Sequence, residues 1–180
     1  MNTFSVRRIS RCELDEFRSV RLEALRLHPN AFGASYEDWC QKPTEFFAER
    51  IDTDNVFGGF DSENKLQGII GISCSTTPKL RHVATIWGMY VRAEMRGTGL
   101  AKLLMKAALE AANSVSTVKL SVATTNYPAQ ALYRSFGFRE WAIDVAALYV
   151  DGVFYDELLM RLDLKADECS KKPLFDGNLL

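Results

Sequence analysis

Two glycines and an arginine stand together where an apolar segment meets a predicted helix. Residues 85–91 are predicted to form a strand, residues 92–98 a polar loop, and a helix is predicted to begin at about Gly99. The first turn of a helix leaves backbone N–H groups unpaired at the positive end of its dipole, where they bind anions. Gly97 and Gly99 let the main chain approach a phosphate, and Arg96 adds a guanidinium for it.

The residues of this loop exclude the two most familiar nucleotide-binding loops. A P-loop ends in Gly-Lys-Ser/Thr, whereas Leu100 and Ala101 follow Gly99 here. A dinucleotide-binding fingerprint needs a third glycine where this chain has Lys102. The pattern Arg-x-x-Gly-x-Ala over residues 96–101 resembles the pyrophosphate loop of the GNAT superfamily of N-acetyltransferases, whose consensus is Arg/Gln-x-x-Gly-x-Gly/Ala.

A second stretch strengthens this resemblance. A predicted strand runs into Asn126, and residues 129–138 then read AQALYRSFGF. Taken singly, Leu132, Tyr133 and Phe136 are also explained as the apolar face of an ordinary helix that ends at Gly137. A strand, an Asn, a helix with Ala-Leu-Tyr and a closing Gly-Phe are similar to the second cofactor-binding motif of the superfamily, and the two motifs occur in the right order.

The resemblance implies acetyl-CoA as the donor, an amine as the acceptor, and no metal. The implied pyrophosphate-binding residues are Arg96, Gly97, Thr98, Gly99, Leu100 and Ala101. Main-chain groups of Met89, Tyr90 and Val91 would pair with the pantetheine arm, which enters a gap between the splayed fourth and fifth strands. A backbone N–H near Met89 or Tyr90 would serve the thioester carbonyl as an oxyanion donor.

Two side chains are implied to act on the cosubstrate. Tyr133 matches the tyrosine that protonates the departing CoA thiolate as general acid, and its alternative role is that of a core aromatic residue. Asn126 matches a position that hydrogen-bonds the CoA arm. Its alternative role is an Asx cap on the following helix, and the two roles can coexist.

No general base follows from the motifs. A lysine-like amine is protonated at pH 7, and forming its neutral state costs about 4–5 kcal/mol, so a group should take the proton. Many members of the superfamily use a Glu on the fourth strand. The matching place here is near Thr85, and residues 82–91 contain no carboxylate. Substitutes are Glu37, Tyr90 and Asp156, each also explained as structural or solvated.

The acceptor is expected to meet aromatic side chains. If Phe32, Tyr36, Trp39 and Tyr155 converge, they form a ring-lined pocket with Glu37 and Asp156 at its edge; alternatively, they only pack beneath a loop. Residues 31–37, 87–91 and 151–157 resemble a bacterial branch of the superfamily with no firm acceptor. A small-molecule amine or amino-acid-like acceptor is the first hypothesis, and a protein N-terminus or lysine is the second.

The predicted elements that position these residues alternate between strands and helices. Strands are expected over residues 4–9, 56–60, 66–75, 82–91, 118–122, 139–150 and 153–164. Helices are expected over residues 12–27, over 44–51 with Thr44 as N-cap, from Gly99, and from about Pro128, with 31–41 a loop or broken helix. The helix from Gly99 should bury Leu100, Leu103, Leu104, Ala107 and Ala111. The expected fold is α/β (α+β): a mixed, mostly antiparallel sheet of about seven strands, splayed between strands 4 and 5, with about four flanking helices.

Composition sets the remaining limits. The 180 residues, 47% apolar and 25% charged, predict one domain over residues 1–164 and a polar C-terminal tail over 165–180. A net charge of −1 gives no reason to expect nucleic acid or a membrane as a partner. The four cysteines lack metal-ligand spacing and residues 1–10 lack an apolar signal sequence, so a cytoplasmic protein is expected. Alternatives to an enzyme are an acyl-CoA-binding sensor and a scaffold that forms a homodimer through its last hairpin.

Overall fold

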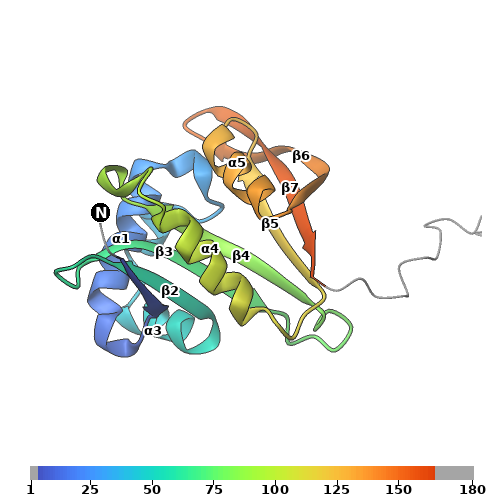
Figure 1. Ribbon diagram of the computed structural model, residues 1–180. Coiled ribbons are helices and arrows are strands. Elements are labelled where there is room, and N and C mark those ends of the chain that lie inside the picture. Colours follow the sequence, from blue (N-terminus) through green and yellow to red (C-terminus); the bar gives the residue numbers. More distant parts are fainter. Residues whose placement is uncertain (1–3, 165–180) are drawn as a thin grey trace, which may run out of the picture.

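The expected mixed sheet of seven strands is confirmed. The computed structural model describes residues 4–164, so the predicted C-terminal tail lies outside the described residues. The strands are β1 Ser5–Arg8, β2 Asn55–Phe60, β3 Leu66–Cys74, β4 Val83–Val91, β5 Thr117–Ala123, β6 Arg139–Val150 and β7 Val153–Asp163. Their spatial order is β1-β2-β3-β4-β5-β7-β6, and every neighbouring pair is antiparallel except β4 and β5 (Figure 1).

Helices cover both faces of the sheet (Figure 1). The α-helices of the described chain are α1 Leu14–Leu27, α2 Tyr36–Trp39, α3 Thr44–Thr53, α4 Leu100–Ala111 and α5 Tyr127–Ser135. The first three pack on one face and α4 and α5 on the other, each over its own apolar cluster. The helix beyond the expected four is α2, a single turn within residues 31–41. Over residues 4–164, no helix is long and apolar enough to cross a membrane.

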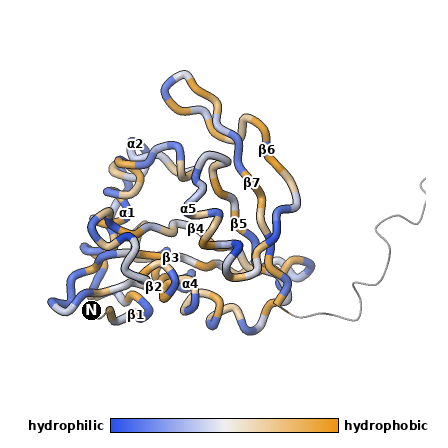
Figure 2. Tube along the Cα trace, turned by 45° about the horizontal axis from the view of Figure 1, so that its top comes forward, coloured by the Kyte–Doolittle hydropathy of each residue, from blue (hydrophilic) through white to orange (hydrophobic). Residues whose placement is uncertain are grey.

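Two apolar layers hold these helices on the sheet. Under α1 and α3, Phe17, Phe47 and Ile69 are almost wholly buried, and on the other face Leu104 and Met160 are. Burial of such a side chain contributes about 1.5–3 kcal/mol. Figure 2 shows the same pattern, with hydrophobic residues along the central strands and hydrophilic residues in the connecting loops.

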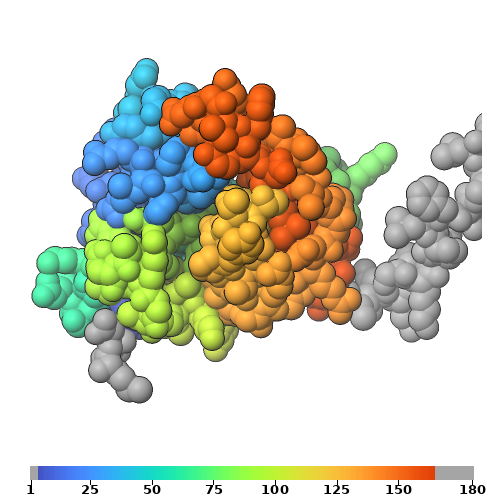
Figure 3. All heavy atoms as spheres, turned by 90° about the horizontal axis from the view of Figure 1, so that it is seen from above, coloured from blue at the N-terminus to red at the C-terminus, as the bar shows by residue number. Residues whose placement is uncertain are grey.

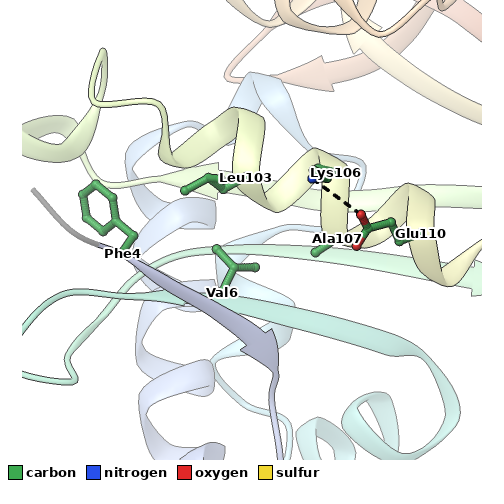
Figure 4. Close-up of a pocket in the computed structure, with 6 residues that line it drawn as sticks. All are labelled: Phe4, Val6, Leu103, Lys106, Ala107 and Glu110. Atoms are coloured by element: carbon green, nitrogen blue, oxygen red, sulfur yellow. Dashed lines mark ion pairs between the residues drawn. The ribbon is translucent and has the colours of Figure 1, made fainter.

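Two expectations about helix residues were wrong. Leu103 is 43% exposed and lines a hollow between α4 and β1 with Phe4, Val6, Lys106, Ala107 and Glu110 (Figure 4). Leu103 lies about 100° around the helix from Leu104. The buried face of α4 consists of Leu100, Leu104, Met105 and Ala108. Ala107 and Ala111, which were also expected to be buried, are only half-buried. Thr44 is the first residue of α3, and Pro43 is its N-cap.

The last two strands form the expected hairpin around Asp151 and Gly152. Strand β6 is the edge of the sheet and exposes large apolar side chains at Trp141, Ile143 and Tyr149. The hairpin extends beyond the neighbouring helices in Figure 2. Self-association through this hairpin stays a prediction, which sizing of the protein in solution would test.

The splay between β4 and β5 is the feature of the sheet that makes room for a ligand. The two strands pair only where Val83–Thr85 of β4 meets Thr117–Lys119 of β5. Beyond Thr85 they diverge, so the side of β4 that faces β5 has no strand partner from Ile86 to Val91 among residues 4–164.

A β-bulge lies in the diverging half of β4. Between the pairs Ile69–Tyr90 and Gly71–Trp87, the single residue Ile70 opposes both Gly88 and Met89, and Gly88 has φ +64°. The inserted residue changes which face the following side chains occupy. Trp87 and Tyr90 therefore both pack on the α1 side of the sheet, while Met89 packs on the α4 side.

Candidate active site

The loop before α4 has the free N–H groups that an anion site requires. Gly97 and Gly99 have φ +77° and +93°, in the left-handed region that favours glycine. Within residues 4–164, no protein group accepts a hydrogen bond from the backbone N–H of Gly97, Thr98, Gly99, Leu100 or Ala101. A Cβ placed on either glycine would meet no other atom within 4 Å, so the space in front of the loop is open. These residues fit a diphosphate group.

The Arg96 side chain connects this loop to the end of β4 and to the end of α1. Its Nε donates to the Val91 carbonyl at 3.2 Å, and its Nη2 lies 3.0 Å from Nε2 of His28 at the end of α1. Burial and the nearby Arg96 charge lower the pKa of His28, which favours a neutral ring that can accept this bond. A direct contact between Arg96 and the diphosphate stays a prediction.

The half of β4 that does not pair with β5 leads directly into this loop. Pairing of the main-chain groups of Met89, Tyr90 and Val91 with the pantetheine arm stays a prediction, for which the side of β4 without a partner strand beyond Thr85 leaves room. The turn at Pro29–Ala31, which follows α1, approaches β5 and β6. In Figure 3 the N-terminal helices in blue, the residues before α4 in yellow-green and those of α5 in yellow-orange meet on one face.

Tyr133 lies on α5, and Asn126 is the N-cap of that helix. Burial raises the pKa of Tyr133 to about 12, and its ring centroid is 6.1 Å from that of Phe138. No group within residues 4–164 hydrogen-bonds its hydroxyl, which stays protonated at neutral pH and is able to donate. Asn126 caps α5, because its Oδ1 accepts from the Ala129 N–H at 3.2 Å. The predicted Asx cap is therefore confirmed, and a contact from its amide nitrogen to CoA stays a prediction.

Tyr90 belongs to a charged cluster that the sequence analysis missed. Its hydroxyl donates to Glu23 Oε1 at 2.9 Å, and Arg92 Nη2 donates to Glu23 Oε2 at 2.7 Å. Burial and the bond to Glu23 raise the pKa of Tyr90 to about 12. Because its hydroxyl is already a donor to a carboxylate, this geometry argues against Tyr90 as the general base. The cluster joins α1 to the end of β4, and so fixes the position of the loop that follows.

We expect Glu23→Gln to lower the free energy of unfolding by about 1–2 kcal/mol at pH 7, because two charge-assisted donors lose their carboxylate in a partly exposed site. Burial raises the pKa of Glu23, but hydrogen bonds from Arg92 and Tyr90 outweigh it and lower the pKa below the ordinary value of 4.5. A lowered pKa stabilises the fold above that value, and the contribution is lost as the pH falls below it.

Urea titrations of both proteins at pH 7 and pH 3.5 measure this effect. The difference between wild type and Glu23→Gln should shrink at the lower pH. Glu110→Gln is the control, because Glu110 lies in an exposed pair 3.8 Å from Lys106 and should change stability by less than about 0.5 kcal/mol. An equal difference at both pH values would show that the carboxylate charge is not what stabilises the junction.

The other candidates for base and pocket are only partly brought together. The Asp156 carboxylate accepts from the Ala146 N–H at 2.8 Å and so holds a bulge of β6, where Ala146 has φ +55°. Glu37 lies exposed on α2, with no hydrogen bond to its carboxylate within residues 4–164. Tyr155 lies on β7, apart from the apolar cluster in which Phe32, Tyr36 and Trp39 pack.

Phe32 and Trp39 converge on a cation rather than on an empty pocket. The guanidinium carbon of Arg21 lies 4.8 Å from each ring centroid and 5.8 Å from that of Trp87. The sequence analysis missed Arg21. Its burial could have been predicted from its position, because Phe17, Arg21 and Ala24 follow the helical spacing of the buried face of α1.

This fold and loop place the protein in a known class, that of the N-acetyltransferases. The chain belongs to the Acetyltransferase (GNAT) family, whose profile matches residues 15–138. No curated protein sequence gives a significant match.

Solved structures of low sequence identity share the fold. The GNAT-family acetyltransferase from Streptococcus pneumoniae is 22% identical with a TM-score of 0.78, over 90% of this chain and 100% of its own. YncA from Salmonella typhimurium, solved with its cofactor acetyl-CoA, is 16% identical with a TM-score of 0.77, over 92% and 96% of the two chains. Ribosomal-protein-alanine N-acetyltransferase from Brucella melitensis is 20% identical with a TM-score of 0.73, over 89% and 99%.

Proposed function

We propose that this protein transfers an acetyl group from acetyl-CoA to the primary amine of a small, amino-acid-like acceptor, by direct attack in a ternary complex. The observation that carries the proposal is the set of N–H groups from Gly97 to Ala101, which have no hydrogen-bond acceptor within residues 4–164. They lie at the start of α4, beside the half of β4 that does not pair with β5. A charge-assisted bond of this kind contributes about 1.5–3 kcal/mol. Several such bonds, with β-augmentation along β4, would hold CoA without any side-chain cation.

Bound acetyl-CoA supplies an activated thioester, and the chain supplies position and proton transfer. The Met89 N–H at the bulge would donate to the acyl oxygen. Tyr133 would hold its proton ready for the sulfur that leaves when the carbon–sulfur bond breaks, and its raised pKa keeps that proton in place at neutral pH. Of the predicted proton acceptors, Glu37 is the one whose carboxylate has no hydrogen bond within residues 4–164, and it would take the proton of the amine through a water molecule.

The test is thiol release from acetyl-CoA by the purified full chain, with products identified by mass spectrometry. The acceptors are small alkylamines, free amino acids, and peptides with either a free N-terminus or a lysine. Acetylation of small amines supports the proposal. Acetylation of peptides alone favours a protein acceptor, the activity in the name of the Brucella structure. Tight CoA binding without turnover favours a sensor, and no CoA binding at all would contradict both readings.

A further inference from the structure

Arg21 of α1 is a buried cation with no hydrogen-bond partner among the described residues. The residue is 4% exposed, and its Nε and Nη1 atoms are both buried with nothing to accept from them within residues 4–164. A guanidinium has five N–H donors and loses its hydration on burial, so buried arginines are usually paired with an acceptor. This arrangement needs a reason beyond packing.

Three aromatic rings hold the Arg21 guanidinium in place, but they cannot satisfy it. Phe32, Trp39 and Trp87 present ring centroids at 4.8–5.8 Å, within the range of cation–π attraction. Such rings offer a diffuse negative face and no acceptor in the plane of the guanidinium. Among the described residues, no carboxylate pairs with Arg21.

The second charge nearby is also positive. Arg50 of α3 lies 5.8 Å from the Trp87 ring and pairs with Asp54 at 3.5 Å. Burial and repulsion from Arg50 lower the pKa of Arg21 to about 10, so the group remains charged at neutral pH. Because Arg50 is paired with Asp54, Arg21 is the uncompensated positive charge of this cluster among residues 4–164, and it would favour an anion.

The Nη1 end of the Arg21 guanidinium lies at the bulge of β4. Its Nη1 is 3.3 Å from the position that a Cβ would occupy on Gly88, and no other residue type would leave this approach open at φ +64°. Gly88 lies in the half of β4 that pairs with β3 but not with β5, next to Met89, whose N–H is the proposed oxyanion donor. Arg21 is thus beside the place where the acetyl group would be transferred.

We propose that Arg21 binds the carboxylate of the acceptor, so that the acceptor is a free α-amino acid or a close analogue. This inference rests on the proposed acetyltransferase function and names its substrate class. A guanidinium binds a carboxylate through two parallel N–H···O bonds. The amine nitrogen and the carboxylate carbon of an α-amino acid are only about 2.5 Å apart, so the group that binds the carboxylate must lie close to the reacting thioester. With its carboxylate on Arg21 beside Gly88, the acceptor would have its amine close to Met89, where the thioester would lie.

The experiment compares free L-amino acids with their C-terminal carboxamides, which keep the amine and lose only the charge. Thiol release from acetyl-CoA gives kcat and KM for each pair. For the wild type, we expect kcat/KM for the free acid to exceed that of the carboxamide by about 100-fold or more. Equal values for acid and carboxamide would overturn the assignment.

Substitutions then test whether Arg21 causes the preference. Arg21→Met should abolish it by raising KM for the acid about 100-fold, with carboxamide kinetics changed less than threefold. Arg21→Lys should restore part of it, because a point charge replaces the guanidinium fork. Arg18→Met is the matched control: Arg18 lies one turn away on α1, with its guanidinium 5.4 Å from the Phe47 ring, and this variant should keep the acid preference. An unchanged preference in Arg21→Met would refute the proposal.

A binding measurement separates this inference from the proposed function. In the presence of CoA, free amino acids should raise the melting temperature of the wild type and carboxamides should not, whether or not acetyl transfer follows. If binding of acids depends on Arg21 but no acceptor is acetylated, the enzymatic proposal fails and the carboxylate site stands. If acceptors are acetylated equally well with and without a carboxylate, the enzymatic proposal stands and the carboxylate site fails. Should Arg21→Met not fold, Arg21→Lys and the wild-type comparison still decide the question.

Discussion

The substitution Gly99→Asp should weaken CoA binding by at least about two orders of magnitude. Gly99 is the N-cap of α4 with φ +93°, and the space in front of its Cα is open. A carboxylate there would stand in the anion site. At roughly 5 Å from a phosphate charge and an effective dielectric constant near 20, repulsion costs about 3 kcal/mol, or about 100-fold in Kd. The measurement is isothermal titration of the full chain with CoA.

Two further variants isolate the charge. Gly99→Asn has nearly the same shape and the same backbone strain, which costs about 1 kcal/mol, and should bind CoA within about tenfold of wild type. Gly152→Asp introduces the same carboxylate at φ +83° in the open turn between β6 and β7, and should bind CoA as wild type does. Equal losses in Gly99→Asp and Gly99→Asn would mean that backbone geometry, not a negative ligand, governs the loop.

Much of the fold could be predicted because its signals are local. The apolar alternation of Val118, Leu120 and Val122 marks β5, Gly137 ends α5, and Asp151-Gly152 makes the last hairpin turn. The free N–H groups of the loop before α4 were also predictable, since they follow from helix geometry and two glycines. These features depend on a few neighbouring residues, so one sequence is enough to identify them.

The chemistry around the gap could not be predicted in the same way. The bulge at Gly88 and Met89 arises from the register between β3 and β4, and no alternation within β4 reveals it. It turns Tyr90 toward Glu23, a residue 67 positions away along the chain, and thereby makes a predicted base into a hydrogen-bond donor. The surroundings of Arg21 likewise could not be predicted, because Phe32, Trp39 and Trp87 come together around it only in the folded chain. Contacts of this kind depend on tertiary packing.

The largest effect on turnover is expected from Tyr133→Phe. If Tyr133 protonates the leaving thiolate, loss of its hydroxyl should lower kcat by about 100-fold and leave the Kd for CoA within about twofold. Stability should change little, since no group within residues 4–164 hydrogen-bonds that hydroxyl. Stopped-flow thiol release gives kcat, and titration with CoA gives Kd. A kcat within threefold of wild type would remove Tyr133 from the mechanism.

The matched control for Tyr133→Phe is Tyr90→Phe. Both tyrosines are buried, and both have a pKa raised to about 12, but of the two hydroxyl groups only that of Tyr90 has a hydrogen-bond partner within residues 4–164. Removing it leaves Glu23 one donor short and should cost about 1–2 kcal/mol of stability, with kcat within about threefold of wild type. Tyr133→Phe should therefore lose activity but keep its stability, whereas Tyr90→Phe should lose stability but keep its activity. Such a crossed result cannot come from general damage to the core, because two tyrosines with the same exposed fraction would then have similar effects.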